Sequence, residues 1–272
     1  MLSVLKIQVI MDIIKSKENS KIKYVRSLNS KKNRDEENSF IVEGIKFVRE
    51  AIKENAHIMF LIFSEGSINK EEVSEMYAIS KKLNIESIIC EDNVFNFVAD
   101  TINAQGVLAV IKKNTNHKAI SNFNFLVLCD RIQDPGNLGT IIRTADAFGP
   151  AAIILNKGCV DAYNPKVVRA SAGAIFRVPF IYVNSDEETI NSLKNSNFMI
   201  YSTVVDSIYS FDDINKSERI CIVIGNEGQG VSQEIINNSH MSITIKMSGR
   251  AESLNASIAA GISIYEIRKK LL

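Results

Sequence analysis

Apolar and polar positions follow two different patterns along the chain, and a polar stretch at residues 112–122 separates them. Before this stretch, short apolar runs alternate with longer segments in which apolar residues recur at helical spacing. This alternation over about 100 residues predicts a small α/β sandwich. The expected strands are FIVEG (40–44), HIMFLIFS (57–64), IESIIC (85–90) and GVLAVIK (106–112), and expected helices include GIKFVREAIKEN (44–55) and NKEEVSEMYAISKKL (69–83).

After the polar stretch, five or six apolar runs recur with helical segments between them. Strands that are apolar without alternation, and that helices connect, indicate a mainly parallel sheet covered on both faces. Ligands bind to such sheets beyond the carboxyl ends of the strands, so the loops that follow the strands are the candidate sites. The expected strands are FLVLCD (125–130), AAIILN (151–156), VPFIYV (178–183), FMIYST (198–203), ICIVIG (220–225) and MSITIK (241–246).

The two patterns predict a domain organisation. We expect an N-terminal extension at 1–14, an α/β domain at 15–112, a linker at 113–121 and a parallel-sheet domain at 122–272. The apolar start of the extension is short, is interrupted by Lys6 and lacks a small-residue cleavage site. It therefore predicts neither a membrane span nor a signal peptide.

The first candidate loop lies in LVLCDRIQDPGNLGTIIRTADAFG, residues 126–149, which predicts a strand, a loop and a helix. Asn137 stands where an N-cap is expected and Gly149 where the C′ residue is expected. The stretch lacks the glycines of a dinucleotide-binding loop and the lysine of a phosphate-binding loop. Alone, it predicts a capped helix with a surface ion pair between Arg143 and Asp146. The residues expected on its buried face are Leu138, Ile141, Ile142, Ala145 and Phe148.

A second loop lies in ICIVIGNEGQGVSQE, where a strand ends at Gly225 and a helix is expected to begin near Val231. Its glycines allow the backbone to turn sharply and to approach a ligand closely. Glu227 at the strand tip is a costly place for a carboxylate unless the side chain has a partner. A plain strand-to-helix turn is an equally good interpretation of this loop alone.

A third loop precedes the final helix, within residues 243–272. Either Ser253 or Asn255 is expected to cap this helix. The small residues Ala256, Ser257, Ala259, Ala260 and Gly261 predict that its first turns pack closely against another element, which a core position alone would explain.

Composition sets limits on function. The 272 residues are 46% hydrophobic and 23% charged with a net charge of +1, as in a globular protein without an overall attraction to nucleic acid or membrane. The four cysteines are widely spaced and the three histidines are scattered. We therefore expect inert thiols in a reducing cytoplasm and no metal site.

Two segments carry local basic charge. Residues 15–34 contain eight Lys or Arg against the single Glu18, with Tyr24 among them as a candidate stacking group. This favours RNA contact over a solvated helix. A weaker bias occurs in residues 161–180, where a solvated face is the usual interpretation. The expected RNA contacts are Lys21, Lys23, Arg26, Lys31, Lys32, Arg34, Lys166 and Arg169.

Together, the three loops match the motifs of one family in order and spacing. The motifs are DPGNLGTIIRTADAFG (134–149), VIGNEGQGVS (223–232) and IKMSGRAESLNASIAAGISIYE (245–266), and NPKVVRASAGAIFRVPF (164–180) between them is also typical. Residues 122–272 thus resemble the SpoU/TrmH family of RNA ribose 2′-O-methyltransferases, within the SPOUT superfamily. FIVEGIKFVREAI (40–52) and QGVLAVI (105–111) resemble, more loosely, the accessory RNA-binding domain of that family, which has a ribosomal-protein-like fold. Lys246 replaces a proline common in the third motif.

The resemblance implies a fold and a cofactor. The C-terminal domain of such proteins forms a deep trefoil knot, an exception to the rule against knots, and its second and third loops wrap S-adenosylmethionine. By resemblance, a homodimer forms through this domain, and Arg143 reaches the site across the dimer interface while Asn137 faces the RNA ribose. The implied cofactor contacts are Gly225, Asn226, Gly230, Ile245, Met247 and Leu254.

The implied reaction is an in-line displacement in which the ribose 2′-oxygen attacks the sulfonium methyl carbon. Arg143 is often taken as the base in this family, but a guanidinium has a pKa above ~12 and stays protonated. We therefore expect Arg143 to stabilise the developing alkoxide and the adjacent phosphate. Glu227, Ser253 and Asn255 are expected to orient the ribose and to relay the proton.

Three functions compete at this point: an rRNA or tRNA 2′-O-methyltransferase, a nucleotide-binding oxidoreductase or hydrolase, and a non-catalytic RNA-binding protein on the same scaffold. The missing phosphate-loop residues disfavour the second. The complete set of expected catalytic residues disfavours the third. A separate RNA-binding domain fits enzymes of large-subunit rRNA better than minimal tRNA enzymes, so we expect rRNA.

Overall fold

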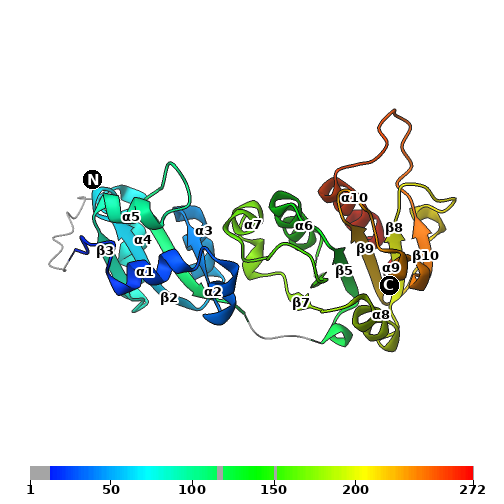
Figure 1. Cartoon of the computed structure of the whole chain (residues 1–272), viewed down its shortest axis with the longest axis horizontal. Helices are drawn as coiled ribbons and strands as arrows, with labels where there is room; N and C mark the ends of the chain where they lie inside the picture. The colour runs from blue at the N-terminus through cyan, green and yellow to red at the C-terminus, as the bar shows by residue number, and fades with distance from the viewer. Residues whose placement is uncertain (1–12, 115–118, 150–151, 272) are drawn as a thin grey trace. The chain divides into compact units, whose positions relative to one another are not determined.

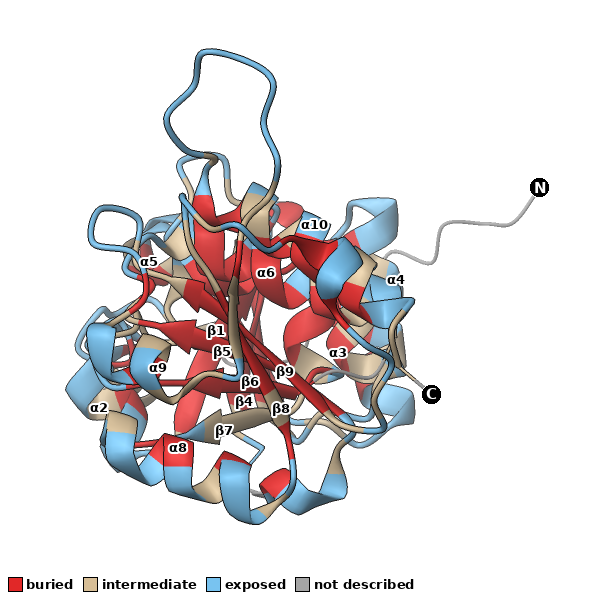
Figure 2. Cartoon of the chain, turned by 90° about the vertical axis from the view of Figure 1, so that its right-hand side faces the viewer, coloured by how far each residue is buried: buried red, intermediate tan, exposed pale blue. Residues whose placement is uncertain are grey.

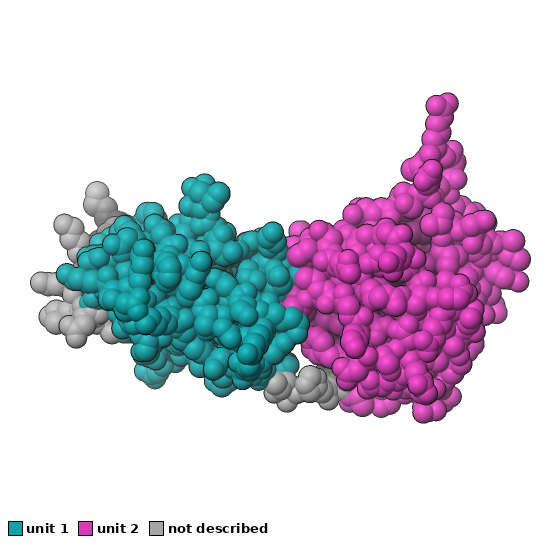
Figure 3. Space-filling view, viewed as in Figure 1, with its two compact units in different colours: residues 1–114, 163–169 teal, residues 115–162, 170–272 magenta. Residues whose placement is uncertain are grey.

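The computed structural model describes residues 13–114, 119–149 and 152–271. These residues fall into two compact units (Figures 1 and 3). Of the described residues, one unit contains 13–114 with Tyr163–Arg169, and the other contains 119–149, 152–162 and 170–271. Much of the expected extension (1–12), part of the expected linker (115–118) and the first residue of one expected strand (151) lie outside the described residues.

The first unit is built on a four-stranded sheet in the order β1-β4-β2-β3. Strand β4 is antiparallel to β1 and β2, and β3 is parallel to β2. Ile14, at the end of the expected extension, forms a parallel bridge to Cys90 in β3. The strands are β1 (Ser39–Glu43), β2 (Ile58–Ser64), β3 (Ser87–Cys90) and β4 (Val107–Lys112).

Helices cover both faces of this sheet, as the pattern of a small sandwich predicts. Helices α1 and α5 pack on one face with Phe60, Ile62 and Leu108, whereas α3 and α4 pack on the other. The residues between these on β2 and β4 are buried as well, so neither face is open to water. The helices are α1 (Ser20–Ser27), α2 (Lys31–Glu36), α3 (Ile45–Lys53), α4 (Glu71–Lys82) and α5 (Asp92–Val98), with a short 3-10 turn η1 (Glu65–Ser67).

The second unit is built on a six-stranded sheet in the order β10-β8-β9-β5-β6-β7, in which every neighbouring pair is parallel. The prediction of a mainly parallel sheet is confirmed. All six carboxyl ends therefore meet at one edge, where ligands bind in open sheets. The strands are β5 (Phe125–Asp130), β6 (Ala152–Leu155), β7 (Phe180–Tyr182), β8 (Met199–Thr203), β9 (Ile220–Gly225) and β10 (Met241–Ile243).

Helices cover both faces of this sheet too. Helices α8 and α9 pack on one face, and α6 and α10 pack against each other and on the other face. A Cβ atom on Gly261 of α10 would lie 3.8 Å from Cγ2 of Thr144 in α6, so the small residues of α10 serve close helix packing as expected. The helices of this unit are α6 (Pro135–Phe148), α8 (Asp186–Asn195), α9 (Gln233–Asn238) and α10 (Ala256–Arg268), with 3-10 turns η2 (Ile120–Asn122), η3 (Ala174–Phe176) and η4 (Phe211–Asp213). Helix α7 (Pro165–Ala170) falls almost entirely in the first unit, which contains Tyr163–Arg169.

The connection between β10 and α10 is the most exposed part of this unit. Residues 246–253 are all exposed, and the loop projects from the unit (Figure 2). In the described part of the chain, none of the helices has the length and apolarity needed to cross a membrane. The trefoil knot stays a prediction.

Candidate active site

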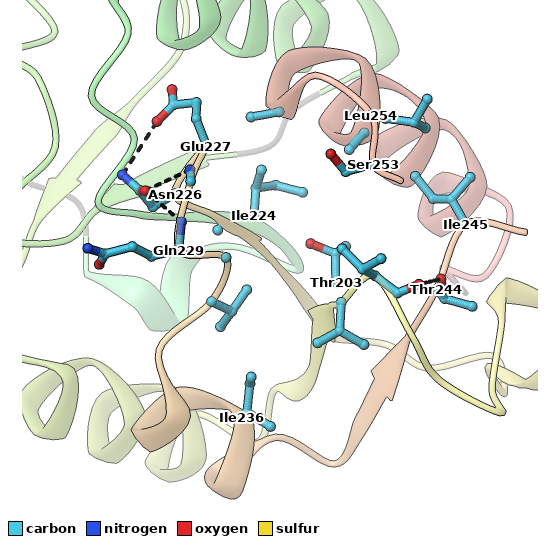
Figure 4. Close-up of a pocket in the computed structure, with 18 of the residues that line it drawn as sticks. Thr203, Ile224, Asn226, Glu227, Gln229, Ile236, Thr244, Ile245, Ser253 and Leu254 are labelled. Carbon is cyan, nitrogen blue, oxygen red and sulfur yellow. Dashed lines mark hydrogen bonds between the residues drawn. The ribbon is translucent and has the colours of Figure 1, made fainter. Parts of the chain in front are cut away.

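A cavity of about 400 Å³ opens at the carboxyl ends of β8, β9 and β10 (Figure 4). Glu227 lies at one end of this cavity, and Thr203 and Thr244 lie at the other. The cavity volume falls within the range of small-molecule sites, roughly 300–1,000 Å³. The lining residues are 203–205 after β8, 224–231 at the end of β9, Ile236 of α9, Thr244, Ile245, Met247, Ser253 and Leu254 between β10 and α10, and Ala256 and Ala259 of α10.

All of the cofactor contacts implied by the family motifs line this one cavity. They come from two loops that are distant in sequence and that the parallel sheet brings to the same edge. The backbone groups of Asn226 and Gly230 bond to each other, at 3.0 and 2.9 Å, and this folds the β9 loop into a tight turn. The six residues are Gly225, Asn226, Gly230, Ile245, Met247 and Leu254.

The chemistry of the wall limits the ligand. Apart from Glu227 and the thioether of Met247, the side chains are aliphatic or carry hydroxyl or amide groups, and no lysine or arginine is among the lining residues. Glu227 is their single charged residue, and it is acidic. A di- or triphosphate would therefore lack compensating charge here, whereas an uncharged or cationic adenosyl compound fits.

Glu227 has the partners that its position at the strand tip requires. Its carboxylate accepts hydrogen bonds from the side-chain amide of Asn137 at 2.9 Å and from the backbone N–H groups of Gln133 at 3.2 Å and Asp134 at 3.1 Å. Burial alone raises the pKa of Glu227, but these hydrogen bonds outweigh burial and hold the pKa below its usual value. Glu227 is therefore a poor proton acceptor, and its contacts favour a role in tying the β9 loop to the start of α6.

Asn137 links Glu227 to the third motif. Its Oδ1 accepts a hydrogen bond from Nδ2 of Asn255 at 2.9 Å, and Oδ1 of Asn255 accepts the backbone N–H of Ser257 at 2.9 Å. Asn255, and not Ser253, is thus the N-cap of α10. One chain of hydrogen bonds joins all three motifs of the sequence.

The expected N-cap of α6 was wrong by three residues. Asp134 caps this helix by accepting the backbone N–H of Asn137 at 2.7 Å, and Pro135 follows in the first turn, where a missing N–H costs nothing. The side chain of Asn137 is 7% exposed and bonds to Glu227 and Asn255 instead.

Other features of the first motif also differ between the prediction and the structure. The ion pair expected between Arg143 and Asp146 does not form, because Asp146 pairs with Arg177 at 2.8 Å. Phe148 is 40% exposed and not on the buried face. Helix α9 begins at Gln233, two residues after Val231 and thus near it as expected, with Ser232 as its N-cap.

Arg143 and Ser253 are the expected catalytic residues that remain free. Arg143 lies on the exposed side of α6, does not line the cavity of its own chain and has no hydrogen bond or ion pair within the described residues. Ser253 lines the cavity and likewise has no hydrogen-bond partner within residues 13–114, 119–149 and 152–271. Both side chains are thus available to a substrate.

Most of the expected RNA contacts are exposed, but many already have acidic partners. Lys21 pairs with Glu86, Lys23 pairs with Glu18, and Arg169 pairs with Asp100. Lys31 and Lys32 pair with acidic residues one helical turn later, Arg26 lies over the ring of Phe97, and Lys166 is exposed. Exposed pairs of this kind contribute little to stability, about 0–1 kcal/mol, so phosphates can compete for these cations.

Arg34 and Tyr24 do not suit the roles expected for them. Arg34 is 2% exposed, and its guanidinium donates hydrogen bonds at 2.9 Å to the carbonyl oxygens of Leu28 and Asn29 after α1. It therefore joins α1 to α2 and is not on the surface. Tyr24 is half-buried, packs against Phe60 and donates its hydroxyl to the sulfur of Met59.

The thiols are free and the pKa values of all four are raised. Burial raises the pKa of Cys90 to about 12 and that of Cys159 to about 11, so neither is a thiolate at neutral pH. Burial likewise raises the pKa values of Cys129 and Cys221. Within the part of the chain that the structure describes, no group of His, Cys, Asp and Glu is arranged to hold a metal ion.

Sequence reasoning missed part of the cavity wall. Thr203, Val204 and Val205 follow β8, which lies between β10 and β9 in the sheet. The rule that ligands bind beyond carboxyl ends applies to β8 as well, but the sequence does not reveal which strands are neighbours.

Comparison with known proteins agrees with this geometry. Residues 124–265 match the SpoU rRNA Methylase family, and residues 19–109 match the MRM3-like substrate binding domain. Over 257 residues, the chain is 32% identical to the 23S rRNA (guanosine(2553)-2′-O)-methyltransferase RlmP of Bacillus subtilis (strain 168). The aligned region covers 94% of this chain and 98% of that protein.

Solved structures resemble the whole chain. The AdoMet-bound rRNA methyltransferase from Sinorhizobium meliloti has a TM-score of 0.82 at 30% identity, covering 95% of this chain and 98% of that one. The SpoU methyltransferase AviRb from Streptomyces viridochromogenes, in complex with AdoMet, has a TM-score of 0.82 at 25% identity, covering 92% and 97%. The family match extends over more than half of the chain and the relatives extend over nearly all of it, so the chain belongs to the SpoU rRNA methylase family.

Proposed function

We propose that this protein uses S-adenosylmethionine to methylate a ribose 2′-hydroxyl in 23S rRNA in the cytoplasm. Membership of the SpoU family gives the reaction class, and the name of the Bacillus subtilis relative supplies the RNA. The observation that carries the proposal is the cavity at β8, β9 and β10. All the residues expected to contact the cofactor line it, and no lysine or arginine that could bind a phosphate is among the lining residues.

The residues present fit this cofactor. The aliphatic side chains of Ile224, Ile245 and Leu254 suit an adenine ring, and the hydroxyls and backbone groups of the two loops suit the ribose and amino acid parts. When bound, S-adenosylmethionine supplies an electrophilic methyl group. The task of the protein is then to position the ribose and to stabilise its oxygen as the proton leaves.

The free side chains divide that task. Ser253, at the cavity wall, contacts the ribose, and the guanidinium of Arg143 stabilises the developing negative charge on the 2′-oxygen. Glu227, Asn137 and Asn255 hold the loops in register through their chain of hydrogen bonds. This division replaces a proton relay through Glu227, whose lowered pKa disfavours it.

The experiment that tests the function is a map of ribose methylation in 23S rRNA and tRNA from cells with and without the gene. Loss of one 2′-O-methyl group in 23S rRNA, restored by the purified protein and S-adenosylmethionine, is the expected result. Loss of a 2′-O-methyl group in tRNA would identify tRNA, and not 23S rRNA, as the substrate. An unchanged map, with no transfer to either RNA in vitro, would favour a non-catalytic RNA-binding protein.

An apolar surface on α6 and α10 supports a homodimer. Ile258, Ile262 and Tyr265 lie at helical spacing on α10 and are 54%, 36% and 49% exposed. The ring of Phe148, at the end of α6, lies 5.4 Å from that of Tyr265. Exposed apolar patches mark interaction sites, and the same helix α6 carries Arg143. Pairing two copies through this surface would bring Arg143 to the cavity of the partner.

Replacing Ile262 by Asp is expected to convert the dimer to a monomer and to abolish methyl transfer, because a charge would be buried in the contact. Sedimentation velocity measures the first effect and methyl incorporation measures the second. Ile208→Asp is the control, since Ile208 is 86% exposed, lies outside the α6 and α10 surface and does not line the cavity. A fully active Ile262→Asp monomer would contradict the proposal.

The cations of α1 are proposed to bind RNA. Replacing Lys21, Lys23 and Arg26 together by Ala is expected to weaken binding and to flatten the dependence of log K on log salt by about two to three units, as each lost phosphate contact removes about 0.7–0.9. Filter binding at several salt concentrations measures the slope. The control replaces Lys70, the N-cap of α4, together with Lys81 and Lys82 in its last turn. Helix α4 packs on the opposite face of the same sheet, and this variant removes the same charge. Equal slopes for the two triple variants would remove this role from α1.

A further inference from the structure

A group of three charges, of which Asp130 is fully buried, lies at the end of β5, at the same edge of the sheet as the cavity. Asp130 is 0% exposed, and its Oδ2 lies 2.6 Å from a terminal guanidinium nitrogen of Arg131. The other terminal nitrogen of Arg131 lies 3.8 Å from Oδ2 of Asp186 in the first turn of α8. None of these three residues lines the cavity, and the proposed reaction leaves them without a role.

This group holds both ends of the loop that forms one wall of the cavity. At the start of the loop, Nδ2 of Asn226 donates to the carbonyl oxygen of Arg131 at 2.7 Å. At its end, the backbone N–H of Ser232 donates to Asp130 at 2.7 Å and its hydroxyl donates to Asp186 at 2.8 Å. The residues between, 226–231, all line the cavity. The shape of this wall thus depends on where the charges hold the loop.

The two carboxylates need a cation between them. Burial raises the pKa of Asp130 and the charge of Asp186 raises it further, while the N–H of Ser232 and the charge of Arg131 lower it. The amide nitrogen of Asn156 also donates to both carboxylates, but it carries no charge. Without the guanidinium, the carboxylates would repel each other in a buried site and would separate or take up a proton.

The conformation of Arg131 is energetically unfavourable in its backbone and in its side chain. Its φ of 58° lies in the left-handed region, which non-glycine residues seldom adopt. Its Nε atom is buried and has no hydrogen-bond partner among the described atoms. A Cβ atom on Gly158 would lie 3.0 Å from Cγ of Arg131, so a larger residue at 158 would crowd the side chain. A strained backbone with an unsatisfied donor persists where the surrounding contacts require it.

We propose that Arg131 is a positioning residue for the cofactor cavity: its guanidinium keeps Asp130 and Asp186 together so that they hold Ser232, and its carbonyl oxygen holds Asn226. This inference rests on the proposed assignment of the cavity to S-adenosylmethionine. It also requires the side chain, and not only the backbone turn at residue 131, to set the affinity for the cofactor.

Arg131→Gly separates side chain from backbone, because glycine adopts a positive φ readily and keeps the carbonyl in place. Calorimetric titration of the full-length protein with S-adenosylmethionine is expected to show a Kd raised about tenfold or more for this variant. Arg131→Lys, which restores a point charge, is expected to fall between Arg131→Gly and the wild type. The RNA affinity is expected to stay unchanged in both.

Arg177→Ala is the matched control. Arg177 also pairs with an aspartate at the second unit's surface, and the Arg177 side chain is 31% exposed, against 32% for Arg131. This variant is expected to bind S-adenosylmethionine within about twofold of the wild type.

Three results would overturn the inference. Arg131→Gly with the cofactor affinity of the wild type would show that only the backbone turn matters. A parallel loss of cofactor affinity, RNA affinity and melting temperature would show a general loss of stability. A wild-type chain that binds RNA but not S-adenosylmethionine would overturn the proposed function and this inference with it.

Discussion

Replacing Gly225 by Ala is expected to lower the affinity for S-adenosylmethionine about 100-fold and to abolish methyl transfer at ordinary cofactor concentrations. A Cβ atom at this position would lie 2.3 Å from the carbonyl carbon of Gly230 and 2.3 Å from the nitrogen of Val231. Both are backbone atoms, so no side-chain rotation relieves the clash, and the loop has to move away from β9.

The site of that clash explains why function suffers more than stability. Asn226 and Gly230 close the turn through two backbone hydrogen bonds, and residues 224–231 form one wall of the cavity. A shift of the loop therefore changes the shape of the cavity, whereas the pairing of β9 with β5 and β8 in the sheet is kept. Calorimetric titration measures the cofactor affinity, and the melting temperature reports on the fold.

Gly249→Ala is the control for this prediction. Gly249 lies in the projecting loop before α10, does not line the cavity and has no atom within 4 Å of an added Cβ. It is expected to keep the cofactor affinity of the wild type. If Gly225→Ala also keeps that affinity, the close approach at β9 does not shape the site.

The central strands of the second unit could be predicted from the sequence because they are buried on both faces. The runs FLVLC and ICIVIG contain no charged residue and do not alternate with polar ones, which only strands covered on both faces require. The structure places β5 and β9, formed by these runs, side by side and parallel at the centre of the sheet. Their neighbours could not be predicted, since the same apolar pattern suits any position in the sheet.

Caps and charges were less predictable because each depends on a partner far away in sequence. Asp134 and Asn137 are both good N-cap residues. The side chain of Asn137 instead donates a hydrogen bond to Glu227, which is 90 residues later in the chain. Arg34 counts as a surface charge in the sequence, yet the free carbonyl groups after α1 hold it inside. Local patterns report residue types but not the partners that compete for them.

The residues expected to contact the cofactor meet in one cavity, whereas many of the expected RNA contacts have acidic partners, and the reason is related. Gly225 and Leu254 belong to motifs whose residue order fixes a loop shape, and the loops meet in one cavity. The RNA contacts near Lys21 are predicted from the density of positive charge over twenty residues of sequence. Acidic residues from other elements, such as Glu86 in the pair with Lys21, do not enter that count.

Replacing Arg143 by Ala is expected to lower kcat for RNA methylation about 100- to 1,000-fold and to leave the affinity for S-adenosylmethionine unchanged. The side chain is exposed, has no partner among the described residues and does not line the cavity of its own chain. Its proposed role is to stabilise negative charge on the ribose oxygen, which develops only during the reaction. Steady-state methyl transfer at saturating RNA and cofactor measures kcat. Arg177→Ala, which disturbs Asp146 one turn further along α6, is the control.

The lysine variant tests the geometry of this contact. Arg143→Lys keeps the charge but loses the planar pair of donors that matches a phosphate and an alkoxide. Its kcat is expected to lie between those of Arg143→Ala and the wild type. Near-normal turnover would contradict a role for the guanidinium, whether as an electrostatic group or as a base.

Mixed dimers determine which subunit Arg143 serves. Arg143→Ala subunits keep an intact cavity, and Gly225→Ala subunits keep an intact Arg143, so each homodimer is expected to be inactive. If Arg143 acts across the interface, a purified mixed dimer contains one complete site and regains about half of the wild-type activity. If Arg143 acts within its own chain, every site in the mixed dimer lacks one part and no activity returns. Recovery of methyl transfer on mixing would therefore establish both the dimer and the shared site.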